Sequence, residues 1–202
     1  MKLVDVTPVA AVVFGADTTE VVKLMMLLKA KGLSLGHSGV TVEAVEKLVE
    51  LYNKGVYPII WEVGSLGASG DLAPLAHLTL AIMGEGWVRY KGEKRATADV
   101  FRELKIKPVK LKATEGLAFL NGTQFMSAWG CYSIMEAERV EKLADFTAAV
   151  SVDAFDAQVS PFHPAIQKIR NHKGQIESAA NVLKFLKGSA IAKQPKNNVQ
   201  DP

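Results

Sequence analysis

The part of the chain best suited to chemistry is a glycine-rich segment that ends in an acidic residue. It reads Gly64-Ser65-Leu66-Gly67-Ala68-Ser69-Gly70-Asp71 and leads into the apolar run 72–83. Glycines allow a backbone to approach another group closely. On composition alone, the favoured interpretation is a loop that cradles an anion at a helix N-terminus.

The order Ala68-Ser69-Gly70 also permits a rarer reaction. The amide nitrogen of Gly70 could attack the carbonyl carbon of Ala68 and close a five-membered ring, because glycine has no side chain to block so tight a turn. Loss of water from Ser69 would then leave a methylidene group. The product, a methylidene-imidazolone, is an electrophile made from the chain itself.

Other polar residues are less specific on their own. The pair Asn121-Gly122 is a common turn sequence. Gln200 lies two residues from the end of the chain. Its interpretation as a solvated tail residue therefore has nearly the same weight as a functional role. His77 lies in an apolar helical run and is expected to be a core residue. The histidines have no spacing typical of metal ligands, so no metal site is expected.

The residue pattern predicts mainly helices around these candidates. Amphipathic spacing predicts helices over 18–31 (capped by Asp17 or a neighbouring threonine), 41–53 and 175–186, and Asp71 is expected to cap a helix over 72–83. Residues 87–95 are expected to form a hairpin, and 96–104 a short helix. The apolar stretch 114–151 predicts one long helix or two stacked helices, with a special turn near Asn121-Gly122. Residues 160–164 are expected to form a loop.

The composition excludes several classes of protein. With 24 basic and 21 acidic residues the net charge is +3, which gives no indication of a nucleic-acid partner. No apolar run approaches the roughly 20 residues that a membrane span needs. The one cysteine, Cys131, has apolar neighbours that favour core packing over a functional thiol, and a single cysteine is typical of a reducing cytoplasm.

Four stretches in this order resemble the aromatic amino acid ammonia-lyase family, and most of all its histidine-specific members. They are residues 35–40, the loop motif 64–75 with its continuation to Gly86, the asparagine motif 115–124, and residues 199–202. The resemblance implies a mainly α fold, a helical bundle of the fumarase/aspartase-like type. A small irregular layer would surround the active-site loop.

The resemblance also implies a role for each candidate residue. Ala68, Ser69 and Gly70 would form the methylidene-imidazolone, with no external cofactor. Asn121 would hydrogen-bond the ring or the substrate amine, and Gln200 would help to line the substrate pocket. Asp71 would assist formation of the ring more than turnover.

The implied reaction is a β-elimination of ammonia from an aromatic L-amino acid. The variants at residues 66–68 and 123–124 favour L-histidine, which would give urocanate. A tyrosine or phenylalanine lyase, or an aminomutase of the same family, remains an alternative. A non-catalytic helical fragment that only packs with partner subunits is a further one.

Family members are longer than this chain. Their catalytic tyrosine lies upstream of the matched motifs, and a carboxylate-binding arginine and long helices follow the last one. We therefore expect residues 1–202 to be a single partial domain, from a truncated, split or engineered protein, and expect it to be inactive alone. Family active sites draw on several subunits, which implies a homotetramer.

Overall fold

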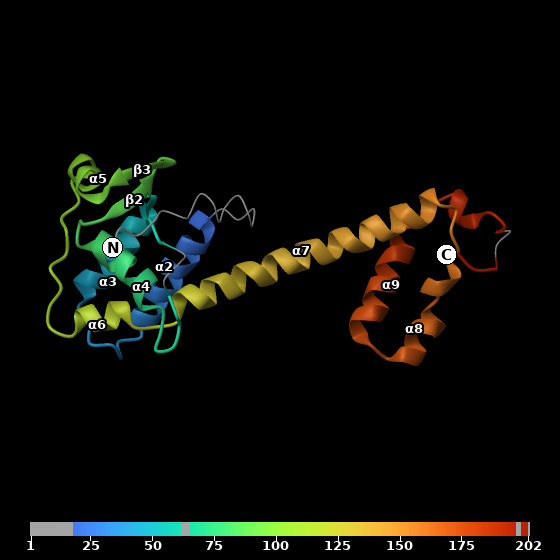
Figure 1. Cartoon of the computed structure of the whole chain (residues 1–202), viewed down its shortest axis with the longest axis horizontal. Coiled ribbons are helices and arrows are strands. Elements are labelled where there is room, and N and C mark those ends of the chain that lie inside the picture. Colours follow the sequence, from blue (N-terminus) through green and yellow to red (C-terminus); the bar gives the residue numbers. More distant parts are fainter. Residues whose placement is uncertain (1–17, 62–64, 197–198, 202) are drawn as a thin grey trace. The chain divides into compact units, whose positions relative to one another are not determined.

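The computed structural model describes residues 18–61, 65–196 and 199–201. The expected cap Asp17 and the first residue of the loop motif, Gly64, lie outside these ranges. The chain divides into two compact units, Met1–Ser133 and Ile134–Pro202 (Figure 1). Each unit has a hydrophobic cluster of its own. Helices dominate both units, which confirms the mainly α fold.

The first unit combines helices with a small sheet. Its elements are α2 (Thr18–Ser34), α3 (Val42–Asn53), β1 (Val56–Pro58), α4 (Leu72–Ile82), β2 (Trp87–Tyr90), β3 (Glu93–Ala96), α5 (Thr97–Leu104), α6 (Glu115–Leu120) and the start of α7 (Gln124–Ala154). These elements confirm the helices and the hairpin expected from the sequence. The break between α6 and α7 falls at the expected Asn121-Gly122 turn.

The core of the first unit forms where the apolar faces of α2, α3, α4 and α6 meet. Its largest fully buried apolar side chains include Met25, Met26, Leu48, Leu75 and Phe119. Burying one such side chain contributes about 1.5–3 kcal/mol, so this cluster is a main source of stability for the unit. The same packing fixes the start of α4, which the candidate loop precedes, and the end of α6, which the Asn121-Gly122 turn follows.

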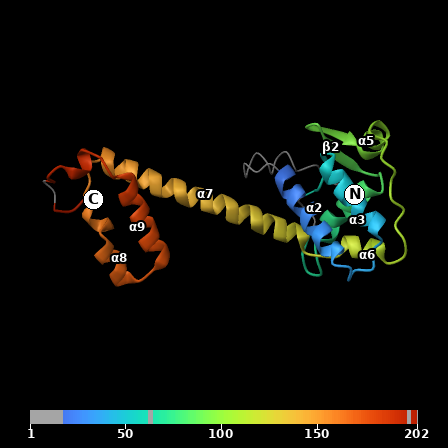
Figure 2. The same cartoon turned by 180° about the vertical axis from the view of Figure 1, so that it is seen from behind.

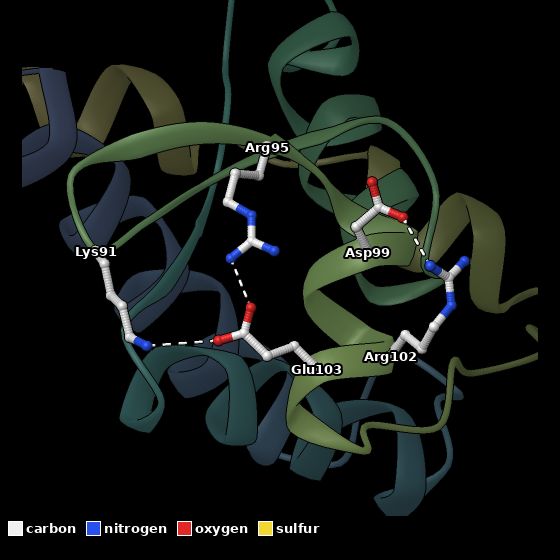
Figure 3. A network of polar contacts seen from close by, with 5 residues as sticks. All are labelled: Lys91, Arg95, Asp99, Arg102 and Glu103. Atoms are coloured by element: carbon white, nitrogen blue, oxygen red, sulfur yellow. Dashed lines mark hydrogen bonds and ion pairs between the residues drawn. The ribbon is translucent and has the colours of Figure 1, made fainter.

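The sheet has the order β1-β2-β3, and both pairs of strands are antiparallel. The β2–β3 hairpin turns at Lys91 and Gly92, both with positive φ, as two-residue hairpin turns of this kind require. Glu103 of α5 reaches back to the hairpin, where it pairs with Arg95 at 2.7 Å and Lys91 at 3.4 Å (Figure 3). The three side chains are 31–69% exposed, so these pairs add little stability.

The second unit is built on the remainder of α7. It adds a short 3-10 turn (Ser160–Phe162), α8 (Pro164–Arg170), α9 (Lys173–Phe185) and a second 3-10 turn (Ile191–Lys193). Helices α8 and α9 lie side by side in both views (Figures 1 and 2). Ala149 of α7 packs with Val182 of α9 and Leu186. The sequence predicted α9, but α8 follows the expected loop and was missed.

The core packing expected for Cys131 was wrong, because its side chain is exposed on α7.

None of the helices described is long and apolar enough to cross a membrane. In the same part of the chain, His, Cys, Asp and Glu side chains form no group of three that could hold a metal ion.

Glu115, the first residue of α6, is a buried carboxylate that joins three segments. It is 1% exposed. Its carboxylate accepts hydrogen bonds from the backbone nitrogen of Lys112 at 2.5 Å and from the backbone nitrogen and hydroxyl of Thr41, both at 2.7 Å. The bond from Lys112, followed by those from Thr41, holds the pKa of Glu115 below its ordinary 4.5, although burial acts in the opposite direction.

We predict that Glu115→Gln destabilises the first unit by about 1–3 kcal/mol at neutral pH, because an amide nitrogen cannot accept the bonds that one carboxylate oxygen accepts. All three tryptophans, Trp61, Trp87 and Trp129, lie in this unit, so their fluorescence during urea unfolding reports its stability. Glu46→Gln, at an exposed position of α3, is the matched control and should change little.

The difference between wild type and Glu115→Gln should depend on pH. A carboxylate whose folded pKa lies below its unfolded value stabilises fully above the unfolded value, here about 4.5, and this contribution is lost as the pH falls through the folded pKa. The stability gap should therefore be constant above this pH and shrink below it. A gap that widens in acid would contradict the assignment.

Candidate functional site

The Ala68-Ser69-Gly70 tripeptide forms a bend in the loop between β1 and α4. Ala68 and Ser69 are exposed, whereas Gly70 is partly buried. Gly67 and Gly70 have φ values of +65° and +122°, which side-chain-bearing residues rarely adopt. The loop therefore presents its alanine and serine outward, from a backbone shape that glycine makes possible.

Gly70 packs against the Asn121-Gly122 turn between α6 and α7. A Cβ atom at Gly70 would lie 2.7 Å from Oδ1 of Asn121 and 2.9 Å from both the nitrogen and the oxygen of Gly122. The backbone nitrogen of Asp71 donates to the Gly122 oxygen at 2.7 Å. The structure thus brings together two motifs that are far apart in the sequence.

Asp71 occupies the N-cap position of α4, but its side chain makes no capping hydrogen bond, so the expected capping role is wrong. Its Oδ2 instead accepts from the backbone nitrogen of Met126, in the first turn of α7, at 3.0 Å. The other oxygen, Oδ1, is buried and has no hydrogen-bond partner in the described structure. The side chain is drawn to α7 because that helix also begins with unpaired backbone N–H groups.

The turn is packed on its other side by Gln124. A Cβ atom at Gly122 would lie 2.1 Å from Oε1 of Gln124, so the glutamine side chain occupies the space next to this glycine. That Oε1 is buried, and it too has no hydrogen-bond partner among the residues described. Two unpaired buried oxygens, on Asp71 and Gln124, therefore accompany the two segments. Such oxygens are uncommon in folded proteins, and a catalytic role is one explanation for them.

Lys29 is a residue of this site that the sequence analysis missed. It is 2% exposed, and its Nζ donates to the backbone oxygen of Asn121 at 3.0 Å. Burial lowers the pKa of its ammonium from the ordinary 10.5 to about 8. A signal was present, because Lys29 lies on the buried face of α2, four residues from both Met25 and Leu33.

Two of the histidines, His77 and His163, accept hydrogen bonds from the backbone, and the other two are exposed. Nδ1 of His77 accepts from the backbone nitrogen of Trp61 at 3.3 Å, and burial lowers the pKa of His77 below its ordinary 6.5. Nδ1 of His163, which is exposed, accepts from the nitrogen of Ala165 at 3.2 Å and so caps α8. His37 and His172 are exposed.

Gln200 belongs to the second unit, whereas the loop and Asn121 belong to the first. Its side chain is exposed. The neighbouring Asp201 anchors this segment, because its Oδ2 accepts from the backbone nitrogen of Gln158 at 2.6 Å. The structure therefore groups Gly70, Asp71 and Asn121 around one turn, and Gln200 is held in place within its own unit.

Sequence and structure comparisons relate the chain to known proteins. The profile of the aromatic amino acid lyase family matches residues 8–202. A histidine ammonia-lyase from Caldanaerobacter subterraneus is 46% identical over 183 residues, covering 90% of this chain and 36% of that protein. The chain belongs to the aromatic amino acid lyase family.

Solved structures of this fold have more than one activity. Histidine ammonia-lyase from Trypanosoma cruzi is 40% identical, with a TM-score of 0.76 over 81% of this chain and 32% of its own. Phenylalanine aminomutase from Pantoea agglomerans is 34% identical, with a TM-score of 0.79 over 85% of this chain and 33% of its own. The chain spans a little over a third of the length of the curated relatives it matches.

We predict that Gly70→Ala destabilises the first unit by about 1–3 kcal/mol, because alanine at this φ is strained and its methyl group would collide with backbone atoms of Gly122. Gly130→Ala, in α7, is the matched control. Nothing lies within 4 Å of a Cβ atom at Gly130, so this change should be neutral or slightly stabilising. Equal tryptophan-monitored stabilities for the two variants would rule out the close contact at Gly70.

Proposed function

We propose that the chain forms the electrophile-bearing part of an ammonia-lyase that converts L-histidine to urocanate and ammonia. The observation that carries this proposal is the packing of Gly70 against the Asn121-Gly122 turn, which brings the glycine of Ala68-Ser69-Gly70 to Asn121. A plain anion-binding loop requires no such partner. Histidine is favoured over other substrates by the 46% identity to a histidine ammonia-lyase.

The electrophile would form from the chain without another reactant. The Gly70 nitrogen bonds to the Ala68 carbonyl carbon, and that carbonyl oxygen leaves as water with the amide hydrogens of Gly70 and Ser69. The Ser69 hydroxyl then leaves as a second water with the hydrogen on its own Cα. The positive φ of Gly70 and the closeness of the Asn121-Gly122 turn favour a tight bend at the point where the ring would close.

Asp71 and Asn121 would support this site in different ways. The unpaired Oδ1 of Asp71, next to Gly70 in the chain, can accept a proton that is displaced during ring closure. Asn121 is exposed, and its Oδ1 lies beside Gly70, so its side-chain amide can also bind the substrate amine. Gln200 would contribute to the substrate pocket of the assembled enzyme.

Once formed, the methylidene-imidazolone supplies an electrophile that makes loss of ammonia easier. The elimination breaks the substrate's C–N bond and a C–H bond on the neighbouring carbon, and leaves a carbon–carbon double bond. An aminomutase is the second candidate, favoured by the similarity to the Pantoea agglomerans structure. An aminomutase would return the amine to the substrate, so free ammonia with urocanate distinguishes the two.

We also propose that the enzyme is a cytoplasmic homo-oligomer, a tetramer in its full form. Support comes from α7, where several large apolar side chains are exposed: Ile134, Met135, Val140, Leu143, Phe146 and Val150. Exposed apolar side chains in such numbers mark surfaces that contact other protein segments, and in the proposed oligomer these segments belong to other copies of the chain.

We predict that the wild-type chain has an intact mass lower than its sequence mass by two water molecules, and that Ser69→Ala cannot show this loss. Alanine preserves the shape of the loop but lacks the hydroxyl that must leave, so folding should be unaffected. Ser65→Ala, in the same loop, is the matched control and should lose both waters. Loss of two waters from Ser69→Ala would exclude this ring.

Turnover gives the corresponding functional test. When the parts of a histidine ammonia-lyase that this chain does not span are supplied by fusion, Ser65→Ala should release urocanate from histidine as wild type does. Ser69→Ala should lose the activity by several orders of magnitude. Near wild-type turnover of the Ser69→Ala fusion would end the ammonia-lyase proposal.

A further inference from the structure

Lys29 is a buried cation that the proposed reaction does not use. It lies on α2 between Met25 and Leu33, whose side chains are 0% and 4% exposed, and it is itself 2% exposed. Burying a charged group costs free energy unless the group is well paired. A lysine at this position of the apolar face therefore lowers the stability of the folded state unless a specific contact offsets the loss of hydration.

That contact is with the candidate site. The Lys29 Nζ donates to the carbonyl oxygen of Asn121 at 3.0 Å. Asn121 is the C-cap of α6, and lysine side chains are suited to pair with the last carbonyl groups of a helix. The same peptide group continues into the nitrogen of Gly122, which faces Gly70.

The two carbonyl groups of the turn, those of Asn121 and Gly122, thus accept hydrogen bonds from different anchors. Lys29 holds the carbonyl group of Asn121, and the backbone nitrogen of Asp71 holds the carbonyl group of Gly122 at 2.7 Å. The second anchor, Asp71, directly follows Gly70 in the chain and is the N-cap residue of α4. Of these two anchors, the one from α2 comes from an element that is a neighbour in sequence to neither the loop nor the turn.

We infer that Lys29 is a positioning residue that fixes the Asn121-Gly122 peptide against Gly70, and so sets the geometry in which the Ala68-Ser69-Gly70 ring closes. This inference rests on the proposed function. Without the ammonium group the turn keeps its place in the chain, but its carbonyl group loses the donor that orients it. Asn121, whose Oδ1 lies beside Gly70, would then be held at the loop only through the neighbouring bond between the Asp71 nitrogen and the Gly122 oxygen.

The test compares Lys29→Met, Lys29→Arg and Lys31→Met in the complete 202-residue chain. Methionine fills a similar space without a donor, and arginine restores a charged donor. Lys31, two residues further along α2, is exposed and serves as the matched control. Each protein is synthesised in a cell-free system, and the loss of two waters is followed over time by intact mass. Thermal unfolding confirms that each variant is folded.

Lys29→Met should slow the loss of water by about tenfold or more, the factor expected from one hydrogen bond to a charged group. Lys29→Arg should recover most of the wild-type rate, and Lys31→Met should match it. In carbon-detected NMR spectra, the carbonyl carbon of Asn121 should shift in Lys29→Met and keep its place in Lys31→Met. This resonance reports the hydrogen bond whether or not the ring forms.

A wild-type rate in Lys29→Met, or an unmoved Asn121 resonance, would overturn the inference and leave the proposed function intact. Absence of water loss from the wild-type chain would instead count against the proposed function. In that case the Asn121 resonance still decides whether Lys29 positions the turn.

Discussion

The contact between Gly70 and the Asn121-Gly122 turn is the constraint on which the rest of the site depends. There is no room between them for even one carbon atom, since a Cβ atom at Gly70 would come within 2.7 Å of the Asn121 side chain. The loop and the turn can therefore occupy their positions only together. The contact holds Gly70, whose nitrogen would attack the Ala68 carbonyl carbon, at a φ of +122°, and Ser69 before it is exposed.

Several elements hold this contact from outside. Helix α2 supplies the ammonium group of Lys29, and α4 and α7 are joined through the carboxylate of Asp71. The start of α6 is tied by Glu115 to Thr41, just before α3. In each of these links the charged partner, Lys29, Asp71 or Glu115, is buried. Free energy from the hydrophobic core of the first unit can thus offset the cost of an unusual loop and of two unpaired buried oxygens.

The sequence predicted the helices well, because their apolar periodicity is local, and it predicted the hairpin from Lys91-Gly92 and the helix break from Asn121-Gly122. The pairing of Gly70 with that break could not be read from local patterns, since it depends on how α4 and α6 pack. The capping role expected of Asp71 was wrong for the same reason: the start of α7, distant in sequence, competes for its carboxylate. Lys29 was overlooked because a lysine among apolar residues is ordinarily taken as a solvated one.

In the proposed function, residues 68–70 of this chain make their own electrophile. Fragment-ion mass spectrometry of the proteolytic peptide that contains the loop tests it most directly, because it assigns a mass to each residue. We expect the deficit of two water molecules to fall wholly within Ala68-Ser69-Gly70, with unmodified masses on both sides. A peptide of full mass, or a deficit located outside these three residues, would contradict it.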